Sequence, residues 1–247
     1  RQKSGELVTN TGTKKRRFRR VESKITAKGA RAIFYRQFLE YKKEKYFIFT
    51  KMTVLSAVVA FIFAYSLQKS VSDSSMAGFI LLGVVAYVAL IMSGYTGKWE
   101  SELKNPYIFL IPDSPLKKMW YATLMEHVKA FADGCIICIP IGIFWHVPAI
   151  EIIYCILIYT VLQADRLYTM VIVQSLLGEV FGKTGQSLLR MFIQMALLGV
   201  GAGVGLLAAV LISQTLIFPI VLIYGLMITV AMGAIALLRF DTMEQFV

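Results

Sequence analysis

Residues 98–129, KWESELKNPYIFLIPDSPLKKMWYATLMEHVK, form the long polar interruption of a chain that otherwise alternates apolar runs with short connectors. Two long apolar stretches precede this segment and four follow it. An apolar run of about 18 residues or more lets a helix cross the roughly 30 Å of hydrocarbon in a bilayer. The segment therefore divides a predicted helical membrane domain into two spans before it and four after it.

The composition agrees with a membrane protein, because 57% of the 247 residues are hydrophobic and soluble domains average about 45–50%. We predict an all-α membrane protein with six transmembrane helices in a domain covering residues 46–240. The predicted spans are approximately Tyr46–Leu67, Met76–Tyr95, Ala130–Val147, Ile150–Ile172, Leu188–Ile212 and Leu216–Leu238.

The formal net charge of +11 is unevenly distributed, since residues 1–52 hold 16 of the 26 Lys and Arg but only 4 of the 15 acidic residues. Residues 1–24 are predicted to be a basic cytoplasmic arm. The arm leads into a hydrophobic span, which favours a membrane surface rather than nucleic acid as its partner. The connectors 68–75, 148–149 and 213–215 contain a single basic residue, Lys69. The positive-inside rule therefore places both termini in the cytoplasm, including a tail at 241–247.

Residues 25–45 have apolar positions at helical spacing with basic residues between them, a pattern typical of an amphipathic helix in the membrane interface. A helix packed on another cytosolic element is the alternative. The apolar positions are Ala30, Ile33, Phe34, Phe38 and Tyr41.

Prolines divide the 98–129 segment into short pieces. Asp113-Ser114-Pro115 predicts a helix start, because an N-cap side chain precedes a proline at the first helical position. Pro106–Ile111 is too short to span a membrane. From Pro115 the apolar positions recur at spacings of three and four into the third predicted span, namely Leu116, Met119, Trp120, Thr123 and Leu124. A short, stiff, amphipathic piece between two membrane helices suits docking into a groove on another protein, although a plain interfacial connector would share the pattern.

Catalytic and metal-binding motifs have little support. The stretch Gly178–Thr184 has three residues between its first glycine and Gly182-Lys183-Thr184, whereas a phosphate-binding P-loop needs four. Cys135 and Cys138 have CxxC spacing but lie in a predicted span, so we interpret them as buried small hydrophobes rather than metal ligands. We predict no enzymatic activity, no catalytic residues and no metal in this chain.

Charges inside predicted spans are informative because they are costly in hydrocarbon. Asp133, Asp165 and Arg166 all fall near the predicted cytoplasmic boundary. We hypothesise an Asp133–Arg166 pair that bridges two helices, with independent snorkelling to the headgroups as the alternative.

The fifth span contains two overlapping GxxxG patterns, Gly199/Gly203 and Gly201/Gly205. Small residues at this spacing allow close helix–helix approach. Packing within the bundle is our preferred interpretation, and a subunit interface is the alternative.

The order of these parts resembles the membrane subunit of a type-2 ABC exporter. The wording NPYIFLIPDSPLKKMWYA resembles bacterial ABC exporter proteins, and the likeness in topology covers roughly residues 28–240. Those proteins tend to be longer, with another membrane region ahead of this one. We therefore expect this chain, which begins at Arg1, to correspond to a C-terminal half.

The resemblance implies a permease in the bacterial cytoplasmic membrane, surrounded by lipid and without its own ATPase. ATP and Mg would bind two copies of a separate cytosolic ABC-type ATPase, and a second permease half, identical or related, would complete the transporter. Residues 98–129 would be a cytoplasmic coupling loop between the second and third spans, with a coupling helix from about Glu100 to Ile111. Its contacts with the ATPase would be Glu100, Glu102, Lys104, Tyr107 and Phe109. The competing hypothesis is a membrane scaffold or assembly protein that docks a cytosolic partner without transport.

Overall fold

The computed structural model describes residues 27–43, 47, 49, 51–68, 74–94, 98–103, 106–177, 182–211 and 216–245. Within these ranges the chain forms helices and connectors, with no β-strand. The predicted all-α class is therefore confirmed, while the basic arm at 1–24 lies outside the described ranges. The elements are α1 Arg31–Lys43, α2 Lys51–Leu67, α3 Ser74–Ser93, α4 Lys98–Leu103, the 3-10 helix η2 Pro106–Ile108, α5 Pro115–Phe144, α6 Ala149–Leu177, α7 Gly182–Leu211 and α8 Ile217–Gln245.

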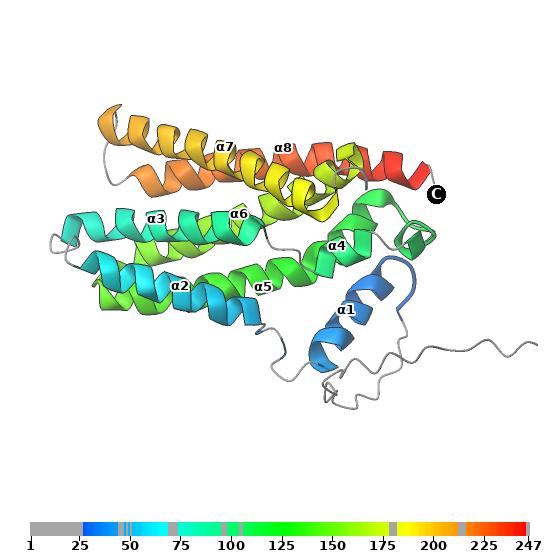
Figure 1. Cartoon of the computed structure of the whole chain (residues 1–247), viewed down its shortest axis with the longest axis horizontal. Coiled ribbons are helices and arrows are strands. Elements are labelled where there is room, and N and C mark those ends of the chain that lie inside the picture. Colours follow the sequence, from blue (N-terminus) through cyan, green and yellow to red (C-terminus); the bar gives the residue numbers. More distant parts are fainter. Residues whose placement is uncertain are drawn as a thin grey trace, which may run out of the picture.

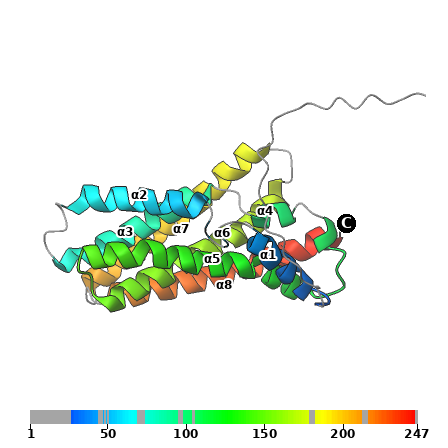
Figure 2. The ribbon, with the colours of Figure 1, turned by 90° about the horizontal axis from the view of Figure 1, so that it is seen from below.

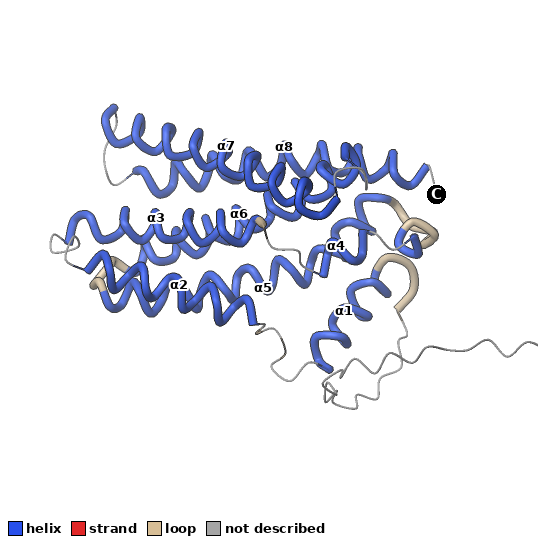
Figure 3. The backbone as a smooth tube through the Cα atoms, viewed as in Figure 1, coloured by secondary structure: helices blue, strands red, loops and turns tan. Residues whose placement is uncertain are grey.

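The long helices α2, α3 and α5–α8 run side by side, and the short elements gather at one end (Figures 1 and 3). We call α1, α4, η2 and residues 109–114 the basal layer. The C-terminal end of α8 lies beside this layer, and the α5–α6 connection lies at the opposite end (Figure 1). The helix α6 contacts α3, α5, α7 and α8, which makes it the central helix of the bundle.

Five described helices are long and apolar enough to cross a membrane, and they correspond to the second to sixth predicted spans. The first predicted span, Tyr46–Leu67, is represented by the 17-residue α2, which is shorter than the other five. Six spans therefore stay a prediction. The chain is a multi-pass helical membrane protein by the length and composition of these helices.

Two helices extend beyond the predicted membrane spans, the first of them along the apolar spacing that predicts a helix from Pro115 into the third span. Residues 115–129 are the first half of α5, a single helix of 30 residues that continues into the third predicted span. At the other end of the chain, α8 continues to Gln245 and takes in most of the predicted tail. Both differences have one cause, since helical periodicity continues through residues too polar to be counted as membrane-spanning.

The predicted helix start before α5 is confirmed, with Ser114 as the N-cap residue and Pro115 as the first helical residue. The stabilising side chain, however, is that of Asp113. Its Oδ1 accepts a hydrogen bond from the Ser114 backbone N–H at 2.9 Å, and its Oδ2 accepts one from the Ala30 N–H at 3.1 Å. These bonds, that from Ala30 most of all, lower the pKa of the Asp113 carboxyl because they stabilise its charged form. They also tie the start of α5 to the residues before α1.

The turn between α5 and α6 closes in four residues. The Val147 N–H bonds the Gly142 carbonyl at 2.9 Å, and the His146 N–H bonds the Ile143 carbonyl at 3.2 Å. His146 has a positive φ of 54°, so these bonds form a Schellman motif, with histidine where glycine is usual. This tight turn makes α5 and α6 antiparallel neighbours.

Two buried clusters hold the helices together. The first lies among α2, α3, α5 and α6, with Leu81, Ile137 and Tyr159 among its members. The second surrounds Trp99 and reaches Phe240 of α8, at the end of the bundle that carries the basal layer (Figure 2). Large apolar side chains elsewhere on the long helices are exposed, as expected of surfaces that face lipid.

Candidate functional site

The short helix α4 is held inside the basal layer by Trp99. This side chain is fully buried, and its indole N–H donates to the Leu167 carbonyl of α6 at 3.2 Å. Tryptophan has a large apolar surface and one hydrogen-bond donor. Here the apolar surface is buried and the donor has an acceptor. Trp99 therefore fixes α4 to the central helix of the bundle.

Glu100 connects α4 to α7 through a buried ion pair. Its Oε2 lies 3.3 Å from Nη1 of Arg190, and both side chains are almost fully buried. Arg190 also donates from Nε to the Gln186 carbonyl and from Nη2 to the Ser187 hydroxyl. Each charge in this pair therefore depends on the other to offset the cost of burial.

Glu102 connects α4 to α1, because its carboxylate accepts a hydrogen bond from the guanidinium of Arg36. On the same side, the ammonium of Lys98 lies 3.7 Å from the centre of the Tyr41 ring, a cation–π contact. The helix α4 is thus attached to α1, α6 and α7 within its six residues.

The buried face of α1 is packed against α5. The Gln37 side chain donates to the Ala122 carbonyl at 3.0 Å, and the Tyr41 hydroxyl lies 3.2 Å from Oε1 of Glu126. This face corresponds to the second sequence-based hypothesis, a helix packed on another element. Gln37, which is not among the apolar positions predicted for this helix, is buried on the same face as Ile33 and Tyr41.

The segment after α4 alternates buried and exposed side chains. Phe109 is buried and packs on Phe240 with ring centres 5.1 Å apart, while Lys118 donates to the Phe109 carbonyl at 3.1 Å. Tyr107 and Leu110 point outward, with 68% and 65% of their surfaces exposed. An apolar surface therefore projects from a firmly anchored segment.

The five predicted contact residues separate into different environments. Glu100, Glu102 and Phe109 are buried and engaged with other parts of the chain, so their side chains offer little surface to a partner. Tyr107 is exposed, as a contact residue should be. Lys104 lies outside the described residues.

Asp133 of α5 and Arg166 of α6 line the same small pocket, as their positions on antiparallel helices predicted. Among the described residues, however, the ion pairs do not include a direct bridge between these two. The Arg166 guanidinium donates instead to the Met92 carbonyl of α3 at 3.1 Å. Within the described residues, no group of three or more His, Cys, Asp or Glu is placed to hold a metal ion.

The two GxxxG patterns of α7 have different surroundings. A Cβ atom added at Gly201 would lie 3.0 Å from the Tyr224 ring, and one added at Gly205 would lie 3.2 Å from Val221, both on α8. Cβ atoms added at Gly199 and Gly203 would meet nothing within 4 Å. The Gly201/Gly205 pair therefore allows α7 and α8 to approach closely within the bundle.

This difference in surroundings predicts that one valine substitution destabilises the protein and another does not. We expect Gly201→Val to destabilise the protein by about 1–3 kcal/mol, because the added atoms overpack against Tyr224. Gly203→Val should change stability by no more than about 0.5 kcal/mol. Thermal unfolding in detergent measures both effects. A lower particle mass for Gly203→Val in light scattering would instead assign Gly199 and Gly203 to a subunit interface.

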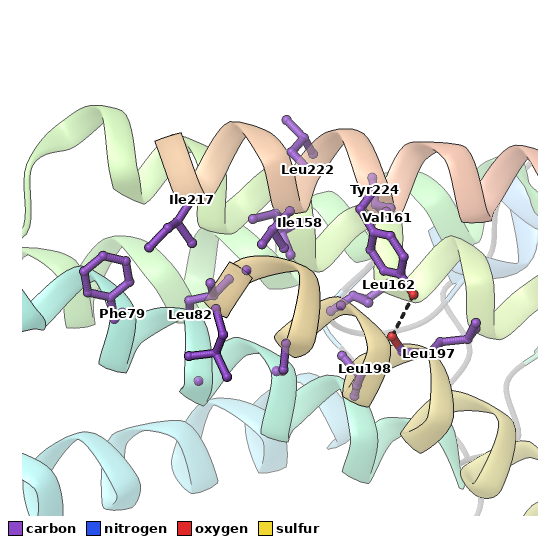
Figure 4. Close-up of a pocket in the computed structure, with 18 of the residues that line it drawn as sticks. Phe79, Leu82, Ile158, Val161, Leu162, Leu197, Leu198, Ile217, Leu222 and Tyr224 are labelled. Carbon is purple, nitrogen blue, oxygen red and sulfur yellow. Dashed lines mark hydrogen bonds between the residues drawn. The ribbon is translucent and has the colours of Figure 1, made fainter. Parts of the chain in front are cut away.

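A large apolar cavity opens among α3, α6, α7 and α8 (Figure 4). Its volume is about 550 Å³, within the range of small-molecule sites. The labelled side chains in Figure 4 include Phe79 of α3, Ile158 of α6, Leu198 of α7 and Tyr224 of α8, whose hydroxyl bonds the Leu197 carbonyl at 3.1 Å. Asp165 is the single charged residue among the described residues that line the cavity.

Sequence reasoning missed both arginines that anchor α4. Arg190 lies three residues into the predicted fifth span, where a basic residue near the cytoplasmic boundary is expected as a flanking charge. Arg36 was interpreted as part of the polar face of an interfacial helix. The signal that could have found them is the pair of acidic residues in α4, since Glu100 and Glu102 each need a cation if they are buried.

The fold and the basal layer define the class: a multi-pass helical membrane protein with an anchored helical layer at one end of its bundle. The model of the family described as "Putative ABC exporter" matches residues 1–244. The chain therefore belongs to this family. The comparisons with curated proteins and with solved structures found no match.

Proposed function

We propose that this chain is the membrane permease of an ABC exporter and that it couples to a separate cytosolic ABC-type ATPase. In this proposal the chain has no ATPase site, and ATP and Mg bind the partner. Family membership supports the exporter assignment. The geometry of α4 supports the mode of coupling.

The observation that carries the proposal is the attachment of α4 to three long-range partners within six residues. Trp99 bonds α6, Glu100 pairs with Arg190 of α7, and Glu102 pairs with Arg36 of α1. A displacement of α4 would therefore move the ends of α6 and α7 together with it. Such rigid-body movement of packed helices is how an ATPase on one side of a membrane can open and close a path through it.

The proposed docking surface is centred on Tyr107 and Leu110. Both are largely exposed, and they lie in the segment that directly follows α4. Exposed aromatic and aliphatic side chains on a rigid support are typical anchors of protein interfaces. In this proposal Tyr107 and Leu110 contact the ATPase, whereas Glu100, Glu102 and Phe109 transmit the movement.

The rest of the proposed assembly follows from the family. The helix α2 would be the remaining one of six spans and the first in chain order. It packs on α3 and α5, and its 17 residues measure about 25 Å. In this proposal six spans return the chain to its starting side, and the basic residues there put that side, with the basal layer and both termini, in the cytoplasm. The transporter would contain a second permease half and two ATPase copies in the bacterial cytoplasmic membrane.

Purification of the tagged chain from its native membranes in mild detergent tests the proposal. We expect an ATPase subunit with a P-loop to co-purify and to hydrolyse ATP in a vanadate-sensitive manner. Tyr107→Ala/Leu110→Ala should reduce the recovered ATPase by about tenfold or more, because it removes the central anchors of the interface.

Tyr65→Ala/Leu211→Ala is the matched control, since both residues are 76% exposed and lie at the opposite end of the bundle. This variant should retain the ATPase. If no ATPase accompanies the wild-type chain, the exporter proposal fails and the scaffold hypothesis replaces it. Full retention of the ATPase by the Tyr107/Leu110 variant would contradict the proposed docking surface.

A further inference from the structure

The cavity among α3, α6, α7 and α8 has an almost entirely apolar wall. On α6 the lining positions are Ile158, Val161, Leu162 and Asp165, whose spacing of three and four residues places them on one face of the helix. Three of these positions are aliphatic, and the fourth is an acid. The cavity therefore offers a large hydrophobic surface with one charged group on it.

Asp165 is 1% exposed, and its Oδ1 has no hydrogen-bond partner. The Thr229 side chain of α8 lies near this carboxyl, but its hydroxyl donates to the Gly225 carbonyl at 2.9 Å. Among the described residues, no Lys or Arg pairs with Asp165. The adjacent Arg166 points elsewhere, because its guanidinium bonds the Met92 carbonyl. Asp165 therefore belongs to the cavity wall, and its Oδ1 is buried there without a hydrogen-bond partner among the described residues.

A carboxylate in hydrocarbon is costly unless a cation or hydrogen-bond donors compensate it. The cavity wall supplies neither to Oδ1, since the one other polar side chain among its lining residues, Tyr224, donates its hydroxyl to the Leu197 carbonyl. An occupant with a positively charged group would complete this site. Its remaining surface would have to be apolar to match the wall.

We propose that this cavity binds a hydrophobic organic amine, with its ammonium group on Asp165 and its apolar body among α3, α7 and α8. Because Oδ1 is buried, the Asp165 side chain rotates toward the cavity on binding. The ammonium then donates a charge-assisted hydrogen bond to the carboxylate, and the body displaces lipid or water from the wall. Binding follows from the cavity alone. The role of such an amine as a transported substrate rests on the proposed exporter function.

Binding of tritium-labelled 1-aminoadamantane to the full chain in nanodiscs of phosphatidylcholine tests this inference. A zwitterionic lipid avoids attraction of the amine to anionic headgroups. We expect saturable binding that unlabelled amine displaces and the neutral isostere 1-hydroxyadamantane does not. Asp165→Asn should weaken binding by about tenfold or more, because it removes the charge and keeps the size of the side chain.

Asp133→Asn is the matched control, since Asp133 is a second intramembrane acid that lines a different pocket. This variant should bind the amine normally.

Gly83→Phe tests the cavity itself, because Gly83 is one of the residues that line it. A Cβ atom added at Gly83 meets nothing within 4 Å, so the phenylalanine should fill the cavity and block binding without a backbone clash. Absence of saturable binding, equal competition by the neutral isostere, or unchanged affinity in Asp165→Asn or Gly83→Phe would overturn the inference.

The outcome is separable from that of the exporter proposal. The binding measurement uses neither ATP nor an ATPase, and recovery of the ATPase does not depend on Asp165. Amine binding without a co-purifying ATPase would leave a binding site in a protein that is not an exporter. A co-purifying ATPase without amine binding would leave the exporter and remove this substrate class.

Discussion

Arg190→Met is expected to destabilise the protein by about 3–5 kcal/mol, because it leaves the buried carboxylate of Glu100 without its cation. The cost is large since the side chain of Glu100 is almost fully buried and water cannot replace the guanidinium. Methionine preserves most of the volume and the helix propensity of arginine. Thermal or denaturant unfolding in detergent measures the loss of stability.

The double variant Glu100→Gln/Arg190→Met separates the charge from the packing. If the cost comes from the loss of the cation beside a buried carboxylate, this variant should recover much of the stability lost in Arg190→Met. Lys117→Met is the matched control for an exposed pair, since Lys117 lies 3.5 Å from Asp113 with most of its side chain in solvent; it should cost at most about 1 kcal/mol. Similar losses in Arg190→Met and Lys117→Met would contradict a buried ion pair.

Trp99→Ala is expected to cost about 3–5 kcal/mol, as for other fully buried aromatic side chains. The substitution leaves a cavity in the cluster around Phe109 and Phe240 and removes the hydrogen bond to the Leu167 carbonyl. It should also loosen α4 from α6. Under the exporter proposal, the amount of co-purified ATPase should stay close to that of the wild type, while its rate of ATP hydrolysis in the complex should fall because α4 no longer moves together with α6. Unfolding in detergent and ATPase assays of the purified complex test the two parts.

Two further tryptophan variants give a comparison for the stability lost in Trp99→Ala. Trp99→Phe keeps most of the ring and loses the donor, so it should cost about 0.5–1.5 kcal/mol from the hydrogen bond, in addition to a smaller packing loss. Trp120→Ala removes a tryptophan that is 51% exposed, and its cost should be well below that of Trp99→Ala. An equal cost for Trp99→Ala and Trp120→Ala would show that burial of Trp99 does not stabilise the basal layer.

The helical class and most of the spans were predictable because they depend on local sequence. A run such as Ile217–Met243 is apolar over more than the length of a bilayer, and no neighbouring element can change that property. The start of α5 was equally predictable, since Ser114 and Pro115 restrict their own backbone. Its continuation into the third span was predictable too, because the apolar residues from Leu116 to Leu124 recur at helical spacing.

The partners of charged residues could not be predicted in the same way. Glu100 pairs with Arg190 across 90 positions of sequence, and Glu102 pairs with Arg36 across 66. From the sequence alone, both acids were predicted to be contact residues for an ATPase. Whether an acid is buried depends on which helices surround it, and that is a property of the packed bundle rather than of its own segment.

The amino-acid sequence by itself determined that this protein is a helical membrane protein with one polar segment between its second and third predicted spans. Apolar length, charge asymmetry and helix-capping residues are read from consecutive positions. Only the tertiary structure decided that α4 is buried against α1, α6 and α7, that Gly201 rather than Gly203 faces α8, and that Asp165 lines a cavity. Each of these depends on the rotation of one helix relative to another, which arises from packing over the whole bundle.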